Sequence, residues 1–160
     1  MGWTIKIGNA TPLFTDGQDG LQAYWIVEDV EVDNAPSFPH DVSAKTNTRT
    51  PSYSVWKEFC QQTGLYELFY NKESGLLEQD QSVVKINKGH LEIIRSALKE
   101  LQAKATKPPG FPDWKIDANR NTIIHIDFDK YDSTLARLLW LDFWFDWALE
   151  NCKIPAIYAL

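Results

Sequence analysis

The chain has 160 residues, of which 44% are apolar, 13% aromatic and 24% charged, as in a globular domain rather than a disordered or fibrous chain. Its 16 Lys and Arg side chains against 22 Asp and Glu give a net charge of −6, which argues against binding nucleic-acid duplexes by neutralising phosphates. Cys60 and Cys152 belong to no cysteine or histidine cluster, so neither a disulfide framework nor a structural zinc site is expected. This length suits a single compact domain spanning residues 1–160.

No targeting or membrane segment is expected. The N-terminal residues lack the charged and then apolar pattern of a signal peptide. The most apolar window, 135–149, contains Arg137, Asp142 and Asp146 and is too short to span a bilayer. The sequence therefore predicts a cytoplasmic protein with reduced thiols.

Two segments of the chain show the pattern of a β-hairpin. Residues 3–7 and 21–27 alternate apolar and polar side chains around the turn formers at 15–20. Further along, 114–116 and 122–128 flank a second group of turn formers at 117–121. Both pairs are predicted to form antiparallel strands.

The segment 33–50 is a long loop with few apolar residues, a length typical of functional or disordered segments. It ends at Thr50 and Pro51, which suit the cap and first position of a helix that Gly64 closes. For residues 65–70 the pattern leaves open a short strand or a further helical turn.

Two more helices are predicted. Asn87 caps the first, which has an apolar stripe and ends near residue 107. Asp132 or Ser133 caps the second, which runs to about Cys152 and is apolar nearly all round, so it lies in the core or also contributes to an oligomer interface. Its acidic stripe is either a solvated face or a partner-binding strip. The stripe consists of Asp142, Asp146 and Glu150.

Together these elements predict an α+β fold. A single compact domain would contain two β-hairpins forming an antiparallel sheet packed on about three helices. The highly apolar C-terminal helix would be the core helix. The oligomeric state, including a homo-oligomer, is left open.

The candidate ligand site lies where the long loop enters the first helix. A helix N-terminus has unsatisfied N–H groups and a partial positive charge that attract a phosphate or carboxylate. Arg49 and Lys45 would supply charge, and Tyr53 and Trp56 would stack on a planar ring. The alternatives are an ordinary polar loop capped by Thr50, with Trp56 in the core, and a loop that binds a protein partner. The predicted binding residues are Lys45, Asn47, Arg49, Ser52, Tyr53, Trp56 and Arg137.

Arg137 interrupts the apolar surface of the last helix. A buried guanidinium needs a carboxylate, carbonyl groups or a bound anion. Three environments remain open: its stem on Trp144 with the head in water, an ion pair with Asp127 or Asp129, or contact with a ligand.

A weak metal site is suggested by His125, Asp127 and Asp129, which alternate along one face of a predicted strand. One imidazole and two carboxylates could ligate a divalent metal or act as acid and base. A polar outer face is the alternative. No metal or other cofactor is expected, and the absence of GxSxG, P-loop, HExxH and dinucleotide-binding motifs argues against a mainstream enzyme.

Three segments resemble small phage- or prophage-type proteins with no assigned activity. These are Gly2–Ala10, Arg49–Trp56 and the last helix from Leu135 to Cys152. The resemblance transfers no functional residue. It implies the cytoplasm of an infected or lysogenic bacterium, where small acidic proteins often bind host molecules in an anti-defence role.

The leading hypothesis is a non-enzymatic protein that binds a small anionic, nucleotide-like ligand and sequesters a host signal. The alternative is a protein–protein inhibitor or accessory factor that binds a host protein through its acidic and aromatic surface. A third hypothesis is a metal-dependent hydrolase built on His125, Asp127 and Asp129.

Overall fold

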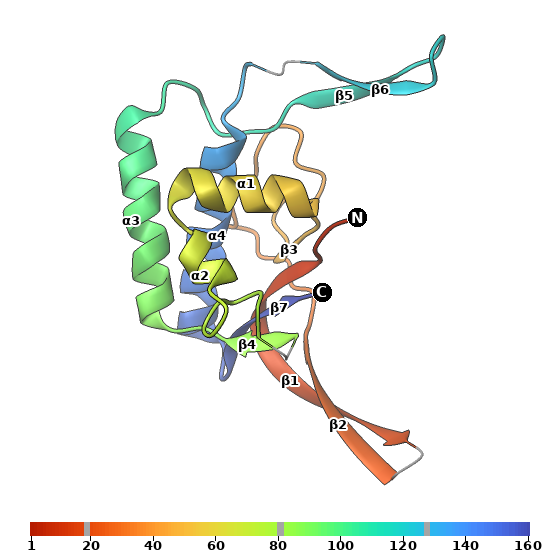
Figure 1. The fold of residues 1–160 in the computed structure, drawn as a ribbon, viewed down its shortest axis with the longest axis vertical. Helices are drawn as coiled ribbons and strands as arrows, with labels where there is room; N and C mark the ends of the chain where they lie inside the picture. Colours follow the sequence, from red (N-terminus) through yellow and green to blue (C-terminus); the bar gives the residue numbers. More distant parts are fainter. Residues whose placement is uncertain (18–19, 80–81, 127–128) are drawn as a thin grey trace.

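The structure, a computed structural model, describes residues 1–17, 20–79, 82–126 and 129–160. Its main sheet is antiparallel, with the strand order β2-β1-β7-β4 and with β3 paired to the start of β1 (Figure 1). The strands are β1 (Ile5–Gly17), β2 (Gly20–Val27), β3 (Thr48–Arg49), β4 (Val83–Lys85) and β7 (Pro155–Ala159).

The long strand β1 changes partners along its length. Its first residues pair with β7, where Ile7 lies opposite Ile157, and from Ala10 onward it pairs with β2. A hairpin is present here, but its first strand is shifted along the chain: residues 10–17, and not the expected 3–7, pair with 20–27, whereas residues 5–9 pair with β7. The short strands β3, β4 and β7 are additions that the sequence pattern did not predict.

The described residues form four helices, of which α4 lies at the centre of the core and packs on β1 and β7 of the main sheet. Figure 1 shows α4 behind α1 and α2, with α3 alongside. Trp144 and Phe145 of α4 are fully buried together with Trp56 and Phe59 of α1. A helix that is apolar nearly all round needs such cover, and the expectation of a C-terminal core helix is confirmed. The helices are α1 (Tyr53–Thr63), α2 (Tyr66–Tyr70), α3 (Lys88–Lys104) and α4 (Ser133–Asn151).

The start of α1 differs from the sequence expectation. Its cap is Ser52, whose hydroxyl accepts the Val55 N–H at 3.3 Å, so Thr50 and Pro51 precede the helix. The Pro51 carbonyl instead accepts the Trp3 N–H at 2.9 Å, which joins the N-terminal residues to this segment. Gly64 ends the helix at φ 76°, a left-handed conformation that glycine adopts without steric cost.

Arg95 of α3 binds two of the three carboxylates in the acidic stripe of α4. Its Nε lies 2.9 Å from Asp142 and its Nη2 lies 3.2 Å from Asp146. Glu150, at the exposed end of the stripe, is the member that Arg95 does not contact. The stripe therefore faces α3, where the single positive charge of Arg95 offsets part of its negative charge.

The second hairpin consists of β5 (Asp113–Asp117) and β6 (Thr122–Ile126), which form a sheet of their own. In the main sheet, β2 and β7 lie on opposite edges of β1. The strand next to the first hairpin is therefore the C-terminal strand β7 and not a strand of the second hairpin. Figure 1 shows the β1–β2 and β5–β6 hairpins projecting to the right of the body, the first below and the second above. The α+β class is confirmed, with the two hairpins in separate sheets.

In the described part of the chain, no helix has both the length and the apolar character needed to cross a membrane.

Candidate functional site

A cavity of about 350 Å³ lies where the segment 38–51, the base of the second hairpin and the first turns of α4 meet. Aromatic rings form much of its wall, contributed by segments that are far apart in the sequence. Arg49, Trp56 and Arg137, three of the predicted binding residues, line this cavity together. The aromatic rings are those of Phe38, Trp56, Phe111, Trp114 and Trp140.

Arg137 enters the cavity from α4, and its guanidinium lies 5.4 Å from the centre of the Phe111 ring. Burial lowers the pKa of Arg137, an effect that the negative charge of Glu58 partly offsets. Within the described ranges, its guanidinium has no hydrogen-bond acceptor and no carboxylate at ion-pair distance. Asp129 does not pair with it, and Asp127 lies outside the described residues.

Arg49 differs from Arg137, because both terminal nitrogens of its guanidinium already have partners within the chain. Nη2 lies 2.7 Å from Asp41, while Nη1 donates to the carbonyls of Ser43, Thr46 and Thr48. The guanidinium also lies 5.0 Å from the centre of the Trp140 ring. Burial lowers the pKa of Arg49, and the carboxylate of Asp41 opposes this shift. Arg49 therefore fixes the cavity wall.

The charges of the cavity wall favour an anion. Among the described residues, two guanidinium groups and one carboxylate line it, which leaves one excess positive charge in a chain of net charge −6. Because Asp41 pairs with Arg49, the excess charge belongs to Arg137. Charges in a partly desolvated wall attract an opposite charge more strongly than charges in bulk water.

Two tryptophans of the wall differ in the state of their indole N–H groups. Trp140 donates its N–H to the Thr46 carbonyl at 3.0 Å. Trp56 is 1% exposed, and its N–H has no acceptor among the residues that the structure describes. Burying an N–H without an acceptor costs free energy, so Trp56 is held by packing and not by hydrogen bonding.

The other four predicted binding residues do not line the cavity. Asn47 is fully buried and acts as a structural link: its amide donates to the Ile7 and Glu28 carbonyls, and its oxygen accepts the Val30 N–H. Ser52 caps α1, and Tyr53 packs edge-on against Trp3 with ring centres 5.1 Å apart. Lys45 adopts a left-handed backbone conformation with φ 66°, and its carbonyl accepts the Val32 N–H.

The structure describes two of the three weak metal candidates, His125 and Asp129. His125 lines the cavity at the base of β6, Asp129 does not line it, and Asp127 lies outside the described residues. Across the ranges that the structure covers, no group of three or more His, Cys, Asp or Glu side chains is arranged to hold a metal ion.

Sequence reasoning missed several wall residues, of which His40, Asp41 and Trp140 matter most. His40 has φ 61°, in the left-handed region, and its Nδ1 lies 3.5 Å from an Asp113 oxygen at the base of β5. Asp41 lies in the stretch that appeared to be an undifferentiated polar loop. Trp140 follows Arg137 by three residues, and this helical spacing was the available signal that the two share a face.

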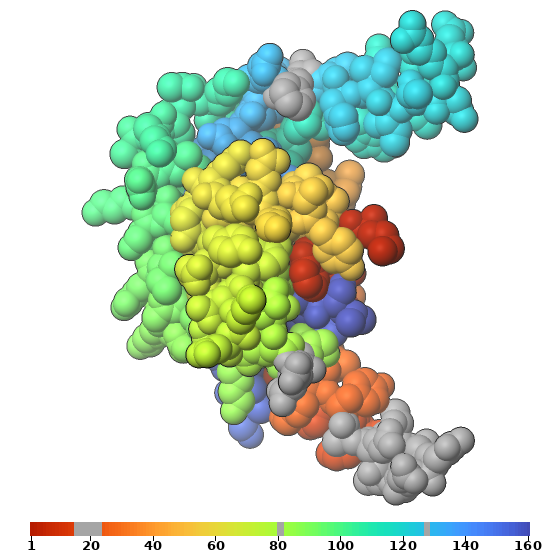
Figure 2. Space-filling model, in the orientation of Figure 1, coloured from red at the N-terminus to blue at the C-terminus, as the bar shows by residue number. Residues whose placement is uncertain are grey.

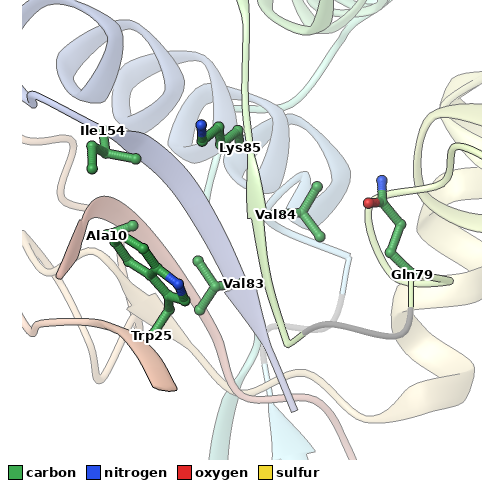
Figure 3. A pocket seen from close by; sticks show the side chains of 7 residues that line it. All are labelled: Ala10, Trp25, Gln79, Val83, Val84, Lys85 and Ile154. Carbon is green, nitrogen blue, oxygen red and sulfur yellow. The ribbon is translucent and has the colours of Figure 1, made fainter. Parts of the chain in front are cut away.

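A second hollow, of about 500 Å³, lies beside the main sheet (Figure 3). In the part of the chain that the structure describes, its wall contains Trp25, Gln79 and apolar side chains, with Lys85 as the one charged residue. Figure 3 shows Gln79 standing apart from the group formed by Trp25, Ala10 and Val83. Polar groups do not converge on one point here, so the cavity at Arg137 is the better candidate for a ligand site.

Comparison with known proteins gives no significant match to any family model, curated protein or solved structure.

Proposed function

We propose that the protein binds a small anionic ligand with a planar ring in the cavity lined by Arg137. The observation that carries the proposal is the position of this guanidinium, which lies over Phe111 in the cavity wall and has no acceptor among the described residues. A guanidinium can make two parallel hydrogen bonds to a phosphate or carboxylate, so an anion would satisfy it.

The size and lining of the cavity support a small organic molecule rather than a simple ion. Small-molecule sites usually have volumes of roughly 300–1,000 Å³, with aromatic walls and few polar groups. The cavity of about 350 Å³ lies at the lower end of this range. Its aromatic walls suit a planar ring, and Arg137 suits the charged group attached to the ring.

A nucleotide combines these two features, a phosphate and a planar base. In the phage setting that the sequence resemblance implies, the bound molecule would be a host nucleotide signal that the protein sequesters. Binding alone is proposed, without a catalytic step.

Titration calorimetry with AMP and with adenosine tests the proposal, because the two ligands differ by the phosphate. We expect AMP to bind at least about tenfold more tightly than adenosine, since charge-assisted hydrogen bonds contribute more than neutral ones. The variant Arg137→Gln should reduce AMP binding to the level of adenosine and leave adenosine binding unchanged. Arg137→Lys should give an intermediate affinity, because lysine keeps the charge and loses the paired hydrogen bonds.

Arg120→Gln provides the matched control, since Arg120 lies in the exposed turn of the second hairpin. It removes the same charge away from the cavity and should leave AMP binding unchanged. Equal affinity for AMP and adenosine, or unchanged AMP binding by Arg137→Gln, would show that this cavity is not an anion site.

A further inference from the structure

The hairpin β5–β6 lacks the support that a two-stranded sheet normally needs. In the part of the chain that the structure describes, its strands pair only with each other, and the hairpin projects from the body (Figures 1 and 2). An isolated hairpin is marginally stable in water, whereas three or more strands with an apolar face are stable. No described residue pairs with the outer edge of β5 or of β6, so both edges are available for pairing.

Large apolar side chains are exposed on both faces of this hairpin. Residues opposite each other in the ladder share a face, which places Ile116 and Ile123 together at 59% and 64% exposure. Trp114 on the same face is 53% exposed. Ile124 and Ile126 on the other face are each 37% exposed. Such a continuous apolar surface marks an interaction site more often than scattered exposed residues do.

We propose that this hairpin pairs with the same hairpin of a second copy of the chain. The two β5 strands would align antiparallel across a two-fold axis and form a four-stranded sheet in the order β6-β5-β5-β6. This arrangement supplies the missing strands and covers the β5 edge that would otherwise expose unpaired N–H and C=O groups.

The charge of the hairpin fits a second copy. Residues 113–126 contain Asp113, Lys115, Asp117 and Arg120, two negative and two positive side chains, whereas the whole chain has a net charge of −6. Two copies would therefore meet at a neutral segment, where the repulsion between acidic chains is smallest.

The alternation of charge along β5 selects one register. When the strands are centred on Ile116, each Lys115 faces Asp117 of the other copy, and the symmetry produces this contact twice. Opposite charges directly across two strands stabilise the pair. A register centred on Lys115 would instead set Asp113 against Asp117, two like charges.

The base of β5 is unsuited to a register centred on Trp114. The Phe111 N–H donates to the Pro39 carbonyl, and Asp113 lies 3.5 Å from His40. Pro112 has no N–H to donate to a ladder. Strand β6 carries no Asp, Glu, Lys or Arg, so its side chains provide no charge pairs to fix a register. The edge of β5 at 115–117 is the segment that has both free backbone groups for pairing and charged side chains that fix the register.

Sedimentation velocity over a series of protein concentrations tests the proposal with variants that reverse the charge at Lys115 or at Asp117. The unchanged chain should form dimers, and Lys115→Asp or Asp117→Lys alone should weaken the dimer about tenfold or more, since each sets like charges opposite each other. An equal mixture of the two single variants should form a heterodimer, because every contact then joins one Lys to one Asp. The heterodimer also shows that both variants fold.

Two variants of the same charge change provide controls. Arg120→Asp changes the charge as Lys115→Asp does, and Glu73→Lys changes it as Asp117→Lys does, each outside the β5 ladder. Both should leave the dimer unchanged. Asp117 also accepts the Asn119 N–H in the turn, so Asp117→Asn removes the charge while keeping an acceptor, and it should weaken the dimer less than Asp117→Lys.

A chain that remains monomeric up to its solubility limit would overturn the proposal. A dimer that is unaffected by Asp117→Lys would overturn it as well, because the strands would then pair elsewhere. Neither result depends on ligand binding at Arg137.

Discussion

Arg49 and Asp41 form an ion pair in the wall of the cavity, with Nη2 and Oδ2 2.7 Å apart and with side chains that are 15% and 5% exposed. The pair fixes the segment 38–49 against α4, where Arg49 also lies over the Trp140 ring. Arg137, on the same cavity, has no such partner among the described residues. The two arginines therefore have different roles, one structural and one available to a ligand.

Arg49→Ala should lower the free energy of unfolding by about 3 kcal/mol, because it leaves the buried carboxylate of Asp41 without its partner. Urea unfolding followed by tryptophan fluorescence measures this change. The double variant Arg49→Ala with Asp41→Ala should recover part of the loss, since no unpaired charge remains buried. A single variant as stable as the original chain would contradict the structural role of Arg49.

Arg137→Gln should change the free energy of unfolding by no more than about 0.5 kcal/mol or increase it, because a partly buried charge without a partner contributes no stability. The same urea titration applies, and Arg49→Ala is the matched comparison. A loss as large as that for Arg49→Ala would reveal a structural partner of Arg137.

Asn47→Ala should lower the free energy of unfolding by about 3 kcal/mol. The side chain is fully buried and joins β1 to the segment 28–30 through three hydrogen bonds, and its loss leaves the Val30 N–H and the Ile7 and Glu28 carbonyls without these partners. Asn151→Ala removes one exposed hydrogen bond to the Trp147 carbonyl and should cost less than about 1 kcal/mol. Thermal unfolding of both variants distinguishes these values.

His90 gives the protein a pH-dependent helix cap. Its Nδ1 accepts the Asn87 N–H at 3.2 Å, and burial lowers its pKa below the ordinary value of 6.5. As the pH falls below that value, the unfolded chain takes up a proton before the folded chain does, so stability decreases. The stability that neutral His90 contributes is fully present above the pKa of His90 in the unfolded chain. It is lost as the pH falls through the lower pKa of His90 in the folded chain.

His90→Gln should retain the capping box, because glutamine at this position also accepts the backbone N–H. The variant should match the original chain at neutral pH and lose less stability between about pH 7 and pH 5, the range around the ordinary histidine pKa. Denaturant unfolding at a series of pH values measures the difference. Parallel curves for the two chains would exclude His90 as the titrating group.

Arg95→Ala should have a small effect, although it removes two ion pairs between α3 and α4. The Arg95 side chain is 51% exposed, and exposed ion pairs contribute about 0–1 kcal/mol. The loss should shrink further at high salt, because salt screens charges that are in contact with solvent. Unfolding of both chains at low and high salt tests this point, and a large salt-independent loss would contradict it.

The sequence predicted the elements whose signals are local and repeated. The apolar stripe of α3, the nearly uniform apolar surface of α4 and the two turn-flanked strand pairs each span many residues. The short strands β3, β4 and β7 depend on pairing with distant segments: Ile157, for example, lies between Ile7 and Val84. Their local sequences show no alternation of apolar and polar residues that would predict a strand. The cap of α1 shifted to Ser52 because Pro51 accepts a hydrogen bond from Trp3.

For the site, the residue types were easier to identify than their surroundings. Arg49, Trp56 and Arg137 do line one cavity, but the sequence could not indicate that Asp41 and three carbonyls occupy the Arg49 guanidinium. Asn47 looked like a ligand donor because a polar residue in a loop is usually exposed, whereas here it is fully buried. What decides each case is the direction of the side chain, which depends on contacts across the fold.

The strand β7 lies between β1 and β4 and pairs with residues at the opposite end of the chain. During synthesis on a ribosome, Ile5 to Asn9 can form their backbone hydrogen bonds to β7 only after Pro155 to Ala159 have been synthesised. Contacts of such long sequence separation slow folding, because the entropy of closing a large loop is lost before the contact forms. The nascent chain will therefore hold an unfinished sheet until its last strand has emerged, the interval in which a chaperone would be most useful to it.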